Sequence, residues 1–185
     1  MLNPFARRSD PHFLAVNMTG VKMGDRVVQI GCAHAARMAA IAAKVGLSGT
    51  ANAITADEAS AARARKAAAQ AGVLVDVDVA SFGRLPLGDE TFDVAVIDDT
   101  TGLLGTLRAE DRVATMRESF RVLRAGGRAI VIGVLPRGGF GALLTRAQSG
   151  PGFDAVAALQ AEGFKSVRKL AEREGLVFTE GIKPR

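Results

Sequence analysis

The sequence predicts an α/β protein built on a mostly parallel sheet with an antiparallel strand at its C-terminal end. Up to about residue 135, short apolar runs rich in Val, Ile and Ala alternate with segments of helical periodicity. Such runs are typical of strands that are buried on both faces of a parallel sheet. The last two apolar runs, 164–170 and 176–182, are joined by too few residues for a parallel crossover, so they are expected to pair antiparallel.

The first strand and helix are predicted from their apolar spacing. A short helix is expected near 11–18, and the apolar run at 25–30 (DRVVQI) predicts the first strand. In the helix expected at 33–45, apolar residues recur three or four positions apart and therefore share one face: Met38, Ile41, Ala42 and Val45.

The next units continue the alternation. Residues 50–54 predict a weaker second strand, and the alanine-rich helix expected at 56–71 is closed by Gly72 at the usual C-cap position. The third strand is expected within 73–79, where apolar residues alternate with two aspartates. One face of this strand is expected to meet solvent, as on the edge of a sheet.

The second half of the chain predicts two more strands before the terminal hairpin. A fourth strand is expected at 93–98 and a fifth at 128–135. The segment 136–152 is rich in Gly and Pro, and its position predicts a loop over the carboxyl edge of the sheet. A further helix is expected at 153–162. The helix between the fourth and fifth strands is predicted from one apolar stripe: Val113, Met116, Phe120 and Leu123.

Length and composition indicate a single domain at 1–185, with an N-terminal segment at 1–24. Of the 185 residues, 48% are hydrophobic and 23% are charged, which is ordinary for a globular protein with a core. Cys32 is the only cysteine, which excludes an internal disulfide and fits a reducing compartment. Neither a signal-peptide core nor an apolar run of membrane-spanning length is visible, so a cytoplasmic protein without a membrane partner is expected.

The net charge of +5 raises the question of a nucleic-acid partner. The basic residues are spaced along predicted helices and loops, and no aromatic residues interleave with them as stacking platforms would. A solvated basic face is therefore favoured over a nucleic-acid site. The substrate, whether a small molecule or a protein, is not identified by the sequence, and an oligomer remains possible.

Two motifs connect the chain to a known family. The stretch FDVAVIDD at 92–99 ends a buried strand in paired acids, and RVLRAGGR at 121–128 joins a helix to the next strand through two glycines. Together they resemble the corresponding helix–turn–strand of class I S-adenosylmethionine-dependent methyltransferases. The resemblance implies a three-layer, Rossmann-like methyltransferase fold with strand order 3-2-1-4-5-7-6, and S-adenosylmethionine as the cofactor.

The resemblance also implies where the cofactor binds, and there the family pattern is only partly present. After the first strand the family has an acid and then Gly-x-Gly-x-Gly, whereas residues 29–35 read QIGCAHA. Gly31, Cys32 and Ala33 are the candidate cofactor-binding residues of this loop, with Ala33 and Ala35 in place of the second and third glycines. If Ala33 has a positive φ, its methyl group costs about 1 kcal/mol.

The remaining candidate contacts follow the next three strands. Thr55 stands where the family has a carboxylate that binds the ribose, and its capping-box spacing with Glu58 favours a helix N-cap instead. Ser81 matches the position that reads the adenine amine, and Phe82 is placed to pack on the adenine. Asp98 ends the fourth strand as a cofactor-side or substrate-side group. It also matches a metal ligand of cation-dependent O-methyltransferases, but the partner ligands are missing, so no metal is expected.

Two functions of different classes remain open. The first is a methyltransferase with a degenerate, weak S-adenosylmethionine site, acting mainly by positioning a substrate heteroatom for in-line methyl transfer. The second is a catalytically inactive relative kept as a binding or assembly module. A nicotinamide-binding reductase is disfavoured by the terminal hairpin and by the missing acid after the second strand. No catalytic residue is identified.

Overall fold

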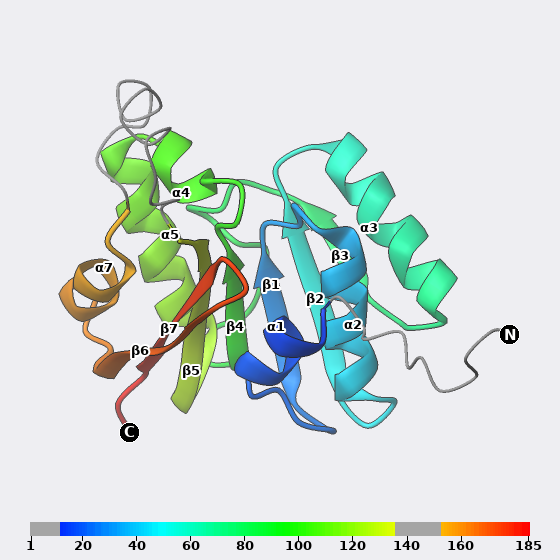
Figure 1. Ribbon diagram of the computed structural model, residues 1–185, viewed down its shortest axis with the longest axis horizontal. Helices are drawn as coiled ribbons and strands as arrows, with labels where there is room; N and C mark the ends of the chain where they lie inside the picture. The colour runs from blue at the N-terminus through cyan, green and yellow to red at the C-terminus, as the bar shows by residue number, and fades with distance from the viewer. Residues whose placement is uncertain (1–11, 136–152) are drawn as a thin grey trace, which may run out of the picture.

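The computed structural model describes residues 12–135 and 153–185. Figure 1 shows a central sheet with helices packed on it. The predicted loop at 136–152 and the first eleven residues of the predicted N-terminal segment lie outside the described part of the chain.

The described residues form one seven-stranded sheet in the order β3-β2-β1-β4-β5-β7-β6. The neighbouring strands from β3 to β5 are parallel, whereas β7 is antiparallel to both β5 and β6. This arrangement confirms the predicted strand order and the predicted terminal hairpin. The strands are β1 (Arg26–Ile30), β2 (Thr50–Thr55), β3 (Asp76–Val79), β4 (Phe92–Asp98), β5 (Leu123–Val134), β6 (Lys165–Arg173) and β7 (Leu176–Ile182).

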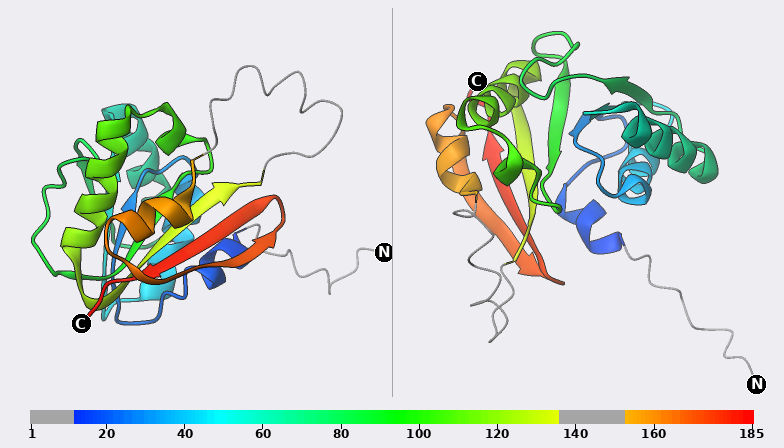
Figure 2. Two further views of the ribbon diagram at one scale, coloured as in Figure 1. Left: turned by 90° about the vertical axis from the view of Figure 1, so that its left-hand side faces the viewer. Right: turned by 90° about the horizontal axis from the view of Figure 1, so that it is seen from above.

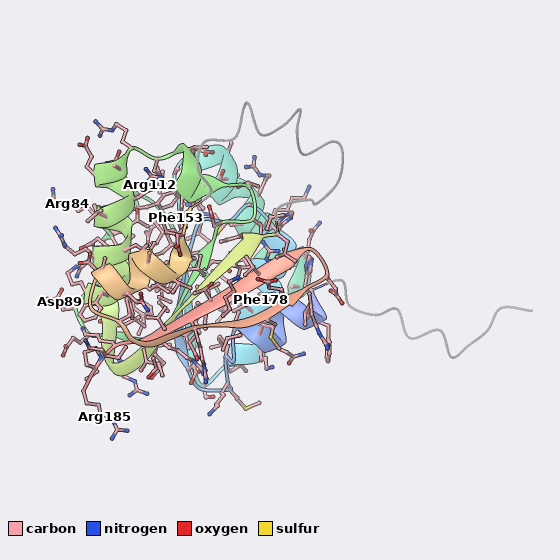
Figure 3. The ribbon with its side chains drawn as sticks, turned by 60° about the vertical axis from the view of Figure 1, so that its left-hand side comes forward. Arg84, Asp89, Arg112, Phe153, Phe178 and Arg185 are labelled. Atoms are coloured by element: carbon pink, nitrogen blue, oxygen red, sulfur yellow. The ribbon has the colours of Figure 1, made fainter. Side chains whose placement is uncertain are left out.

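Helices cover both faces of the sheet, which gives the three predicted layers (Figure 2). Successive strand residues point to opposite faces, so Val28 packs with α4, α5 and α7 while Val27 packs with α1 and α2. Phe178 on β7 is fully buried on the second of these faces (Figure 3). The helices are α1 (Phe13–Met18), α2 (Ala35–Val45), α3 (Glu58–Ala71), α4 (Leu103–Thr106), α5 (Ala109–Val122) and α7 (Ala155–Ala161).

The two-glycine motif lies inside β5 rather than in a turn before it. Helix α5 ends at Val122 and β5 begins at the next residue. Gly126 has a φ of 75°, a conformation that favours glycine, and its N–H donates to the Lys183 carbonyl at 3.0 Å. A Cβ at Gly127 would lie 2.8 Å from the Arg124 carbonyl oxygen. Both glycines are therefore required where the C-terminal end of the chain packs against β5.

The apolar stripe predicted for α5 is only partly correct. Met116 is buried, and Phe120 packs edge-on against Phe164 with ring centroids 4.9 Å apart. Val113 is 49% exposed, however, and Leu123 is the first residue of β5. Leu123 was assigned to the wrong element because helical spacing does not show where a helix stops when a strand follows without a loop.

The sheet edge at β3 confirms the predicted edge strand. This strand has only four residues and carries two aspartates. The guanidinium of Arg65 on α3 donates to the Val77 carbonyl oxygen at 3.1 Å. Short length, charge and a covering side chain are the usual means by which an edge avoids pairing with another chain.

Candidate functional site

The candidate site lies at the carboxyl ends of β1 and β4, where the strand order of the sheet reverses. Chain connections leave β1 toward β2 on one side and reach β4 on the other, which makes this the switch point at which open α/β sheets bind ligands. Gly31 follows β1 and Asp98 ends β4. A Cβ placed on Gly31 would lie 3.2 Å from the Asp98 carbonyl oxygen, so the two strand ends are in close contact.

Gly31 has a structural reason to be glycine. Its φ is 78°, and its N–H donates to the Ile54 carbonyl at 3.0 Å. A Cβ at this position would also lie 2.8 Å from the Cδ2 atom of Leu103, at the start of α4. The space directly above Gly31 is therefore filled by the Leu103 side chain.

The two alanines that replace family glycines are not strained. Among the described residues, the non-glycine residues with positive φ are Glu90, Ser166 and Glu174. The conditional expectation of strain at Ala33 is therefore not met, because Ala33 is an exposed residue just before α2 and needs no left-handed conformation. The helix begins at Ala35, two residues later than predicted.

Thr55 is not the helix N-cap that its spacing favoured. The cap of α3 is Asp57, whose carboxylate accepts from the Ser60 N–H at 2.7 Å. Thr55 ends β2 and is 1% exposed, and its hydroxyl lies 3.2 Å from the Asp78 carbonyl oxygen and 3.3 Å from that of Asp57. Because this hydroxyl serves the main chain, Thr55 does not fit the role of a ribose-binding carboxylate.

Ser81 and Phe82 follow β3 but differ in exposure. Ser81 is exposed, and its hydroxyl oxygen accepts from the Gly83 N–H at 3.3 Å within a local turn. Phe82 is 6% exposed and belongs to the core between the sheet and α5. In this structure, little of the Phe82 ring is therefore available to a nucleobase.

Asp98 is held by a buried ion pair. The Arg37 Nη2 atom on α2 lies 2.7 Å from Asp98 Oδ1 and 2.8 Å from Oδ2, and the two residues are 4% and 1% exposed. Thr100 completes the group, since its hydroxyl donates to Asp98 Oδ1 at 2.6 Å and accepts from Arg37 Nη2 at 2.8 Å. A charge-assisted network of this kind fixes the end of β4 against the first turn of α2.

Two buried polar atoms beside this group have no hydrogen-bond partner within the described residues: Gln29 Oε1 and Arg37 Nε. Gln29 stands where the family has an acid, and its amide nitrogen donates to the Gly31 carbonyl at 3.0 Å. One orphan is an acceptor and the other is a donor, and buried polar atoms are rarely left unpaired. The unpartnered acceptor, Gln29 Oε1, fits the ammonium of an amino-acid group, although Thr55 fits no ribose.

Cys32 lies in the same loop as Gly31, and its thiol has low reactivity. Burial, with a smaller effect of the negative charge of Asp98, raises the pKa of the Cys32 thiol to about 12. The thiol is therefore protonated at neutral pH and is a poor nucleophile. Its role in the folded protein is packing, in a cluster with Met38, Ala53 and Ala64.

Asp99 is expected to make the stability of the folded protein depend on pH. Burial raises the pKa of the Asp99 carboxyl, as does Asp98, while the Leu104 N–H at 2.7 Å opposes the rise. A raised pKa in the folded state means that the stability contribution of Asp99 is present at low pH and is lost as pH rises through that pKa. We expect Asp99→Asn, which keeps an acceptor for Leu104, to raise the melting temperature slightly at pH 7. The gain should vanish near pH 4 in thermal unfolding followed by circular dichroism.

Sequence reasoning missed Arg37, Thr100 and Leu103. A signal for Arg37 was present, because it lies four and eight positions before Ile41 and Val45 on the buried stripe of α2. A charged side chain on such a stripe is rarely buried without a partner. The strand end at Asp98 was the natural candidate for that partner.

Neither a metal-binding cluster nor a membrane-spanning helix is found among the described residues. No group of three or more His, Cys, Asp or Glu side chains within residues 12–135 and 153–185 is arranged to hold a metal ion. Over the same residues, no helix combines the length and apolar character needed to cross a membrane.

Two cavities in the described structure lie at the opposite edge of the sheet. One of about 470 Å³ is lined by the residues that open β2 and β3, including Gly49, Thr50 and Asp76. The other, of about 390 Å³, is lined by charged residues near the starts of β1, β4 and β5, including Asp25, Asp93 and Arg128. Neither coincides with the candidate site at the carboxyl edge.

Comparisons with known proteins agree with this architecture. A family model described as a methyltransferase domain matches residues 28–131, more than half of the chain. No curated protein sequence gives a significant match.

Solved structures show the same fold at low identity. A SAM-dependent methyltransferase from Aquifex aeolicus is 17% identical with a TM-score of 0.72, covering 93% of this chain and 89% of its own. A putative methyltransferase from Bacillus halodurans is 11% identical with a TM-score of 0.72, covering 95% and 99%. The [4+2]-cyclase SpnF is 18% identical with a TM-score of 0.66, covering 94% and 79%.

The name of the last of these structures describes a cyclase, so the shared fold does not by itself fix the reaction. The family match spans β1 to β5, which contains both Gly31 and Asp98. The strand order, the reversed β7 and the matched segment lead to one conclusion: the chain belongs to the methyltransferase-domain family of class I S-adenosylmethionine-dependent methyltransferases.

Proposed function

We propose that the protein is an S-adenosylmethionine-dependent methyltransferase with a weak cofactor site. The observation that carries the proposal is the pairing of Gly31 with Asp98 at the switch point of the sheet. A bare backbone after β1 allows close approach of a ligand, and an acid at the end of β4 supplies a negative charge beside it.

The residues of this chain fit the cofactor at one end and not at the other. Gln29 Oε1 is a buried acceptor without a partner in the described structure, which suits the ammonium of an amino-acid moiety. At the ribose end, the Thr55 hydroxyl is directed to main-chain carbonyl oxygens. The two acids that follow it are engaged elsewhere, Asp57 in capping α3 and Glu58 in a pair with Arg65. We therefore place the expected weakness at the nucleoside end.

The chemistry proposed for the site is methyl transfer to a substrate heteroatom. S-adenosylmethionine would supply an electrophilic methyl group on a sulfonium. The tasks of the chain are to hold the two reactants in line and to exclude water, and positioning of this kind can supply several kcal/mol of the barrier reduction. Asp98 would set the electrostatic potential where the methyl group is transferred, and Leu103 would exclude water from that place.

We expect calorimetric titration with S-adenosylmethionine to give a dissociation constant of about tens of micromolar or weaker. The physical reason is the loss of charged hydrogen bonds to the ribose, since each ~1.4 kcal/mol changes affinity tenfold. S-adenosylhomocysteine serves as the second ligand. A submicromolar constant would contradict the proposal of a weak site.

The second candidate function is a cofactor-free binding or assembly module. The observation that favours it is the closed state of the site, in which Arg37 neutralises Asp98 and Leu103 covers Gly31. The same titration decides between the two: no heat and no thermal stabilisation at millimolar S-adenosylmethionine would favour the module, because a ligand that binds the native state must stabilise it.

A further inference from the structure

The carboxyl edge contains a positive charge that the family pattern does not explain. Arg37 and Asp98 are both more than nine-tenths buried, and a single nitrogen of the guanidinium serves both carboxylate oxygens. Buried ions require partners because leaving either one alone in a low-dielectric interior is strongly unfavourable. In the described structure, Arg37 and Asp98 neutralise each other.

This pairing leaves the guanidinium only partly used. Arg37 Nη2 has three acceptors, whereas Nε is buried with none in the described part of the molecule. The planar fork of an arginine can bind a carboxylate through two nitrogens at once, so the observed geometry is not the best that Arg37 can make.

The backbone around the pair is closed to a ligand. A Cβ on Gly31 would lie 2.8 Å from Leu103 Cδ2, so the Leu103 side chain occupies the space beside this glycine. The helix of Leu103 is attached to β4 through the Asp99 carboxylate, which accepts from the Leu104 N–H at 2.7 Å. Thr100 joins this connection to Arg37 through its hydroxyl at 2.8 Å. The β4–α4 connection and α2 are thus tied together across the end of β1.

We propose that Arg37 is an internal counter-ion that keeps the cofactor site closed until a cationic ligand takes its place beside Asp98. The proposal rests on the proposed function and identifies how the site selects its ligand. The sulfonium of S-adenosylmethionine would take the place of Arg37 as the cation near Asp98 and so release the guanidinium. S-adenosylhomocysteine lacks the sulfonium charge, so it would not displace Arg37.

The direct test is calorimetry on Arg37→Met with both ligands. Methionine keeps the length and apolar stem of the side chain but removes the competing charge. We expect S-adenosylmethionine to bind at least about tenfold more tightly than to the unchanged protein, and the preference over S-adenosylhomocysteine to widen by a similar factor. Unchanged or weaker S-adenosylmethionine binding would overturn the proposal, as would an equal gain for both ligands, which would indicate steric relief alone.

Two matched variants control for charge. Arg37→Lys keeps a cation at the position, so it should not show the tighter S-adenosylmethionine binding expected of Arg37→Met. Arg117→Met removes the same charge from α5, where the Arg117 side chain is 68% exposed and pairs with Glu162, and should change neither the affinity nor the ligand preference. If Arg117→Met reproduced the effect of Arg37→Met, the net charge of the protein rather than the local pair would be responsible.

Cys32 provides a second readout that needs no cofactor. It is the only cysteine in the chain, is 6% exposed in the loop after β1, and is close enough to Asp98 to be affected by its charge. We expect N-ethylmaleimide to modify Cys32 several-fold faster in Arg37→Met than in Arg117→Met under native conditions, measured by intact mass. Equal modification rates in the two variants would contradict the proposed closure of the site, regardless of the results of ligand binding.

The two readouts separate this proposal from the proposed function. If no variant binds S-adenosylmethionine but Arg37→Met exposes Cys32, the closure stands and the methyltransferase function fails. Should Arg37→Met not fold, Thr100→Val is the milder variant, because it removes only the hydroxyl that bridges Arg37 and Asp98. It should accelerate Cys32 modification in the same direction, and an unchanged rate in a folded Thr100→Val protein would again overturn the proposal.

Discussion

Replacing Asp98 with alanine is expected to lower the free energy of unfolding by about 3–5 kcal/mol, because it leaves the buried Arg37 guanidinium without its counter-ion. Arg37 is 4% exposed and cannot recover water without displacing the packing around α2. Urea unfolding followed by far-ultraviolet circular dichroism is the suitable measurement. Fluorescence is less useful because the chain has neither Trp nor Tyr.

Two comparisons show whether the ion pair causes the loss. Asp89→Ala removes a carboxylate that lies on the surface of the protein (Figure 3). Asp89 pairs with Arg121, and ion pairs open to solvent contribute less than about 1 kcal/mol. The double change Arg37→Met with Asp98→Leu should recover much of the stability, since an apolar pair of similar volume often replaces a buried ion pair without loss. A loss below about 1 kcal/mol for Asp98→Ala would mean that Arg37 finds solvent or another partner.

The architecture followed from patterns that are local in sequence. Strands β1 and β4 are apolar on both faces because helices cover both, and continuous Val and Ile runs reveal this directly. The short connection before Leu176 could only be antiparallel, which settled the reversed strand. These features depend on neighbours within a few residues, and so a single sequence displays them.

The ends of the elements were less predictable, because several signals competed there. The capping-box spacing favoured Thr55 as the N-cap of the helix, but the chain uses Asp57, because β2 extends through Thr55. The threonine hydroxyl then bonds to carbonyl oxygens of β3 and of the loop before α3. Strand length, which decided the outcome, is set by pairing with β3 and is not visible in the capping pattern itself.

The candidate site could be located but not assembled from the sequence. Gly31 and Asp98 were recognised from their places after strands, whereas their contacts were not. Asp98 and Arg37 are 61 residues apart, and Leu103 reaches Gly31 from the other side of β4. Side-chain contacts of this range depend on rotamers and on how elements pack, which no spacing rule encodes.

The variant that restores the family pattern, Ala33→Gly with Ala35→Gly and Thr55→Asp, is expected to lose stability without gaining affinity. A carboxylate at position 55 would be buried against the carbonyl oxygens of Asp57 and Asp78 with no donor facing it, at a cost of about 3 kcal/mol or more. Glycine at the first residue of α2 adds up to about 1 kcal/mol. Neither alanine is strained, so their replacement relieves nothing.

The measurement combines urea unfolding with calorimetric titration of S-adenosylmethionine. The double variant without Thr55→Asp is the matched control, and it should lose less than about 2 kcal/mol, because only the two glycines then contribute. If the triple variant were as stable as the unchanged protein and bound the cofactor more tightly, the missing motif residues rather than the closure by Arg37 would limit binding. The expected result is the opposite, because the glycines widen a loop that Leu103 still covers, and the ion pair beside it is untouched.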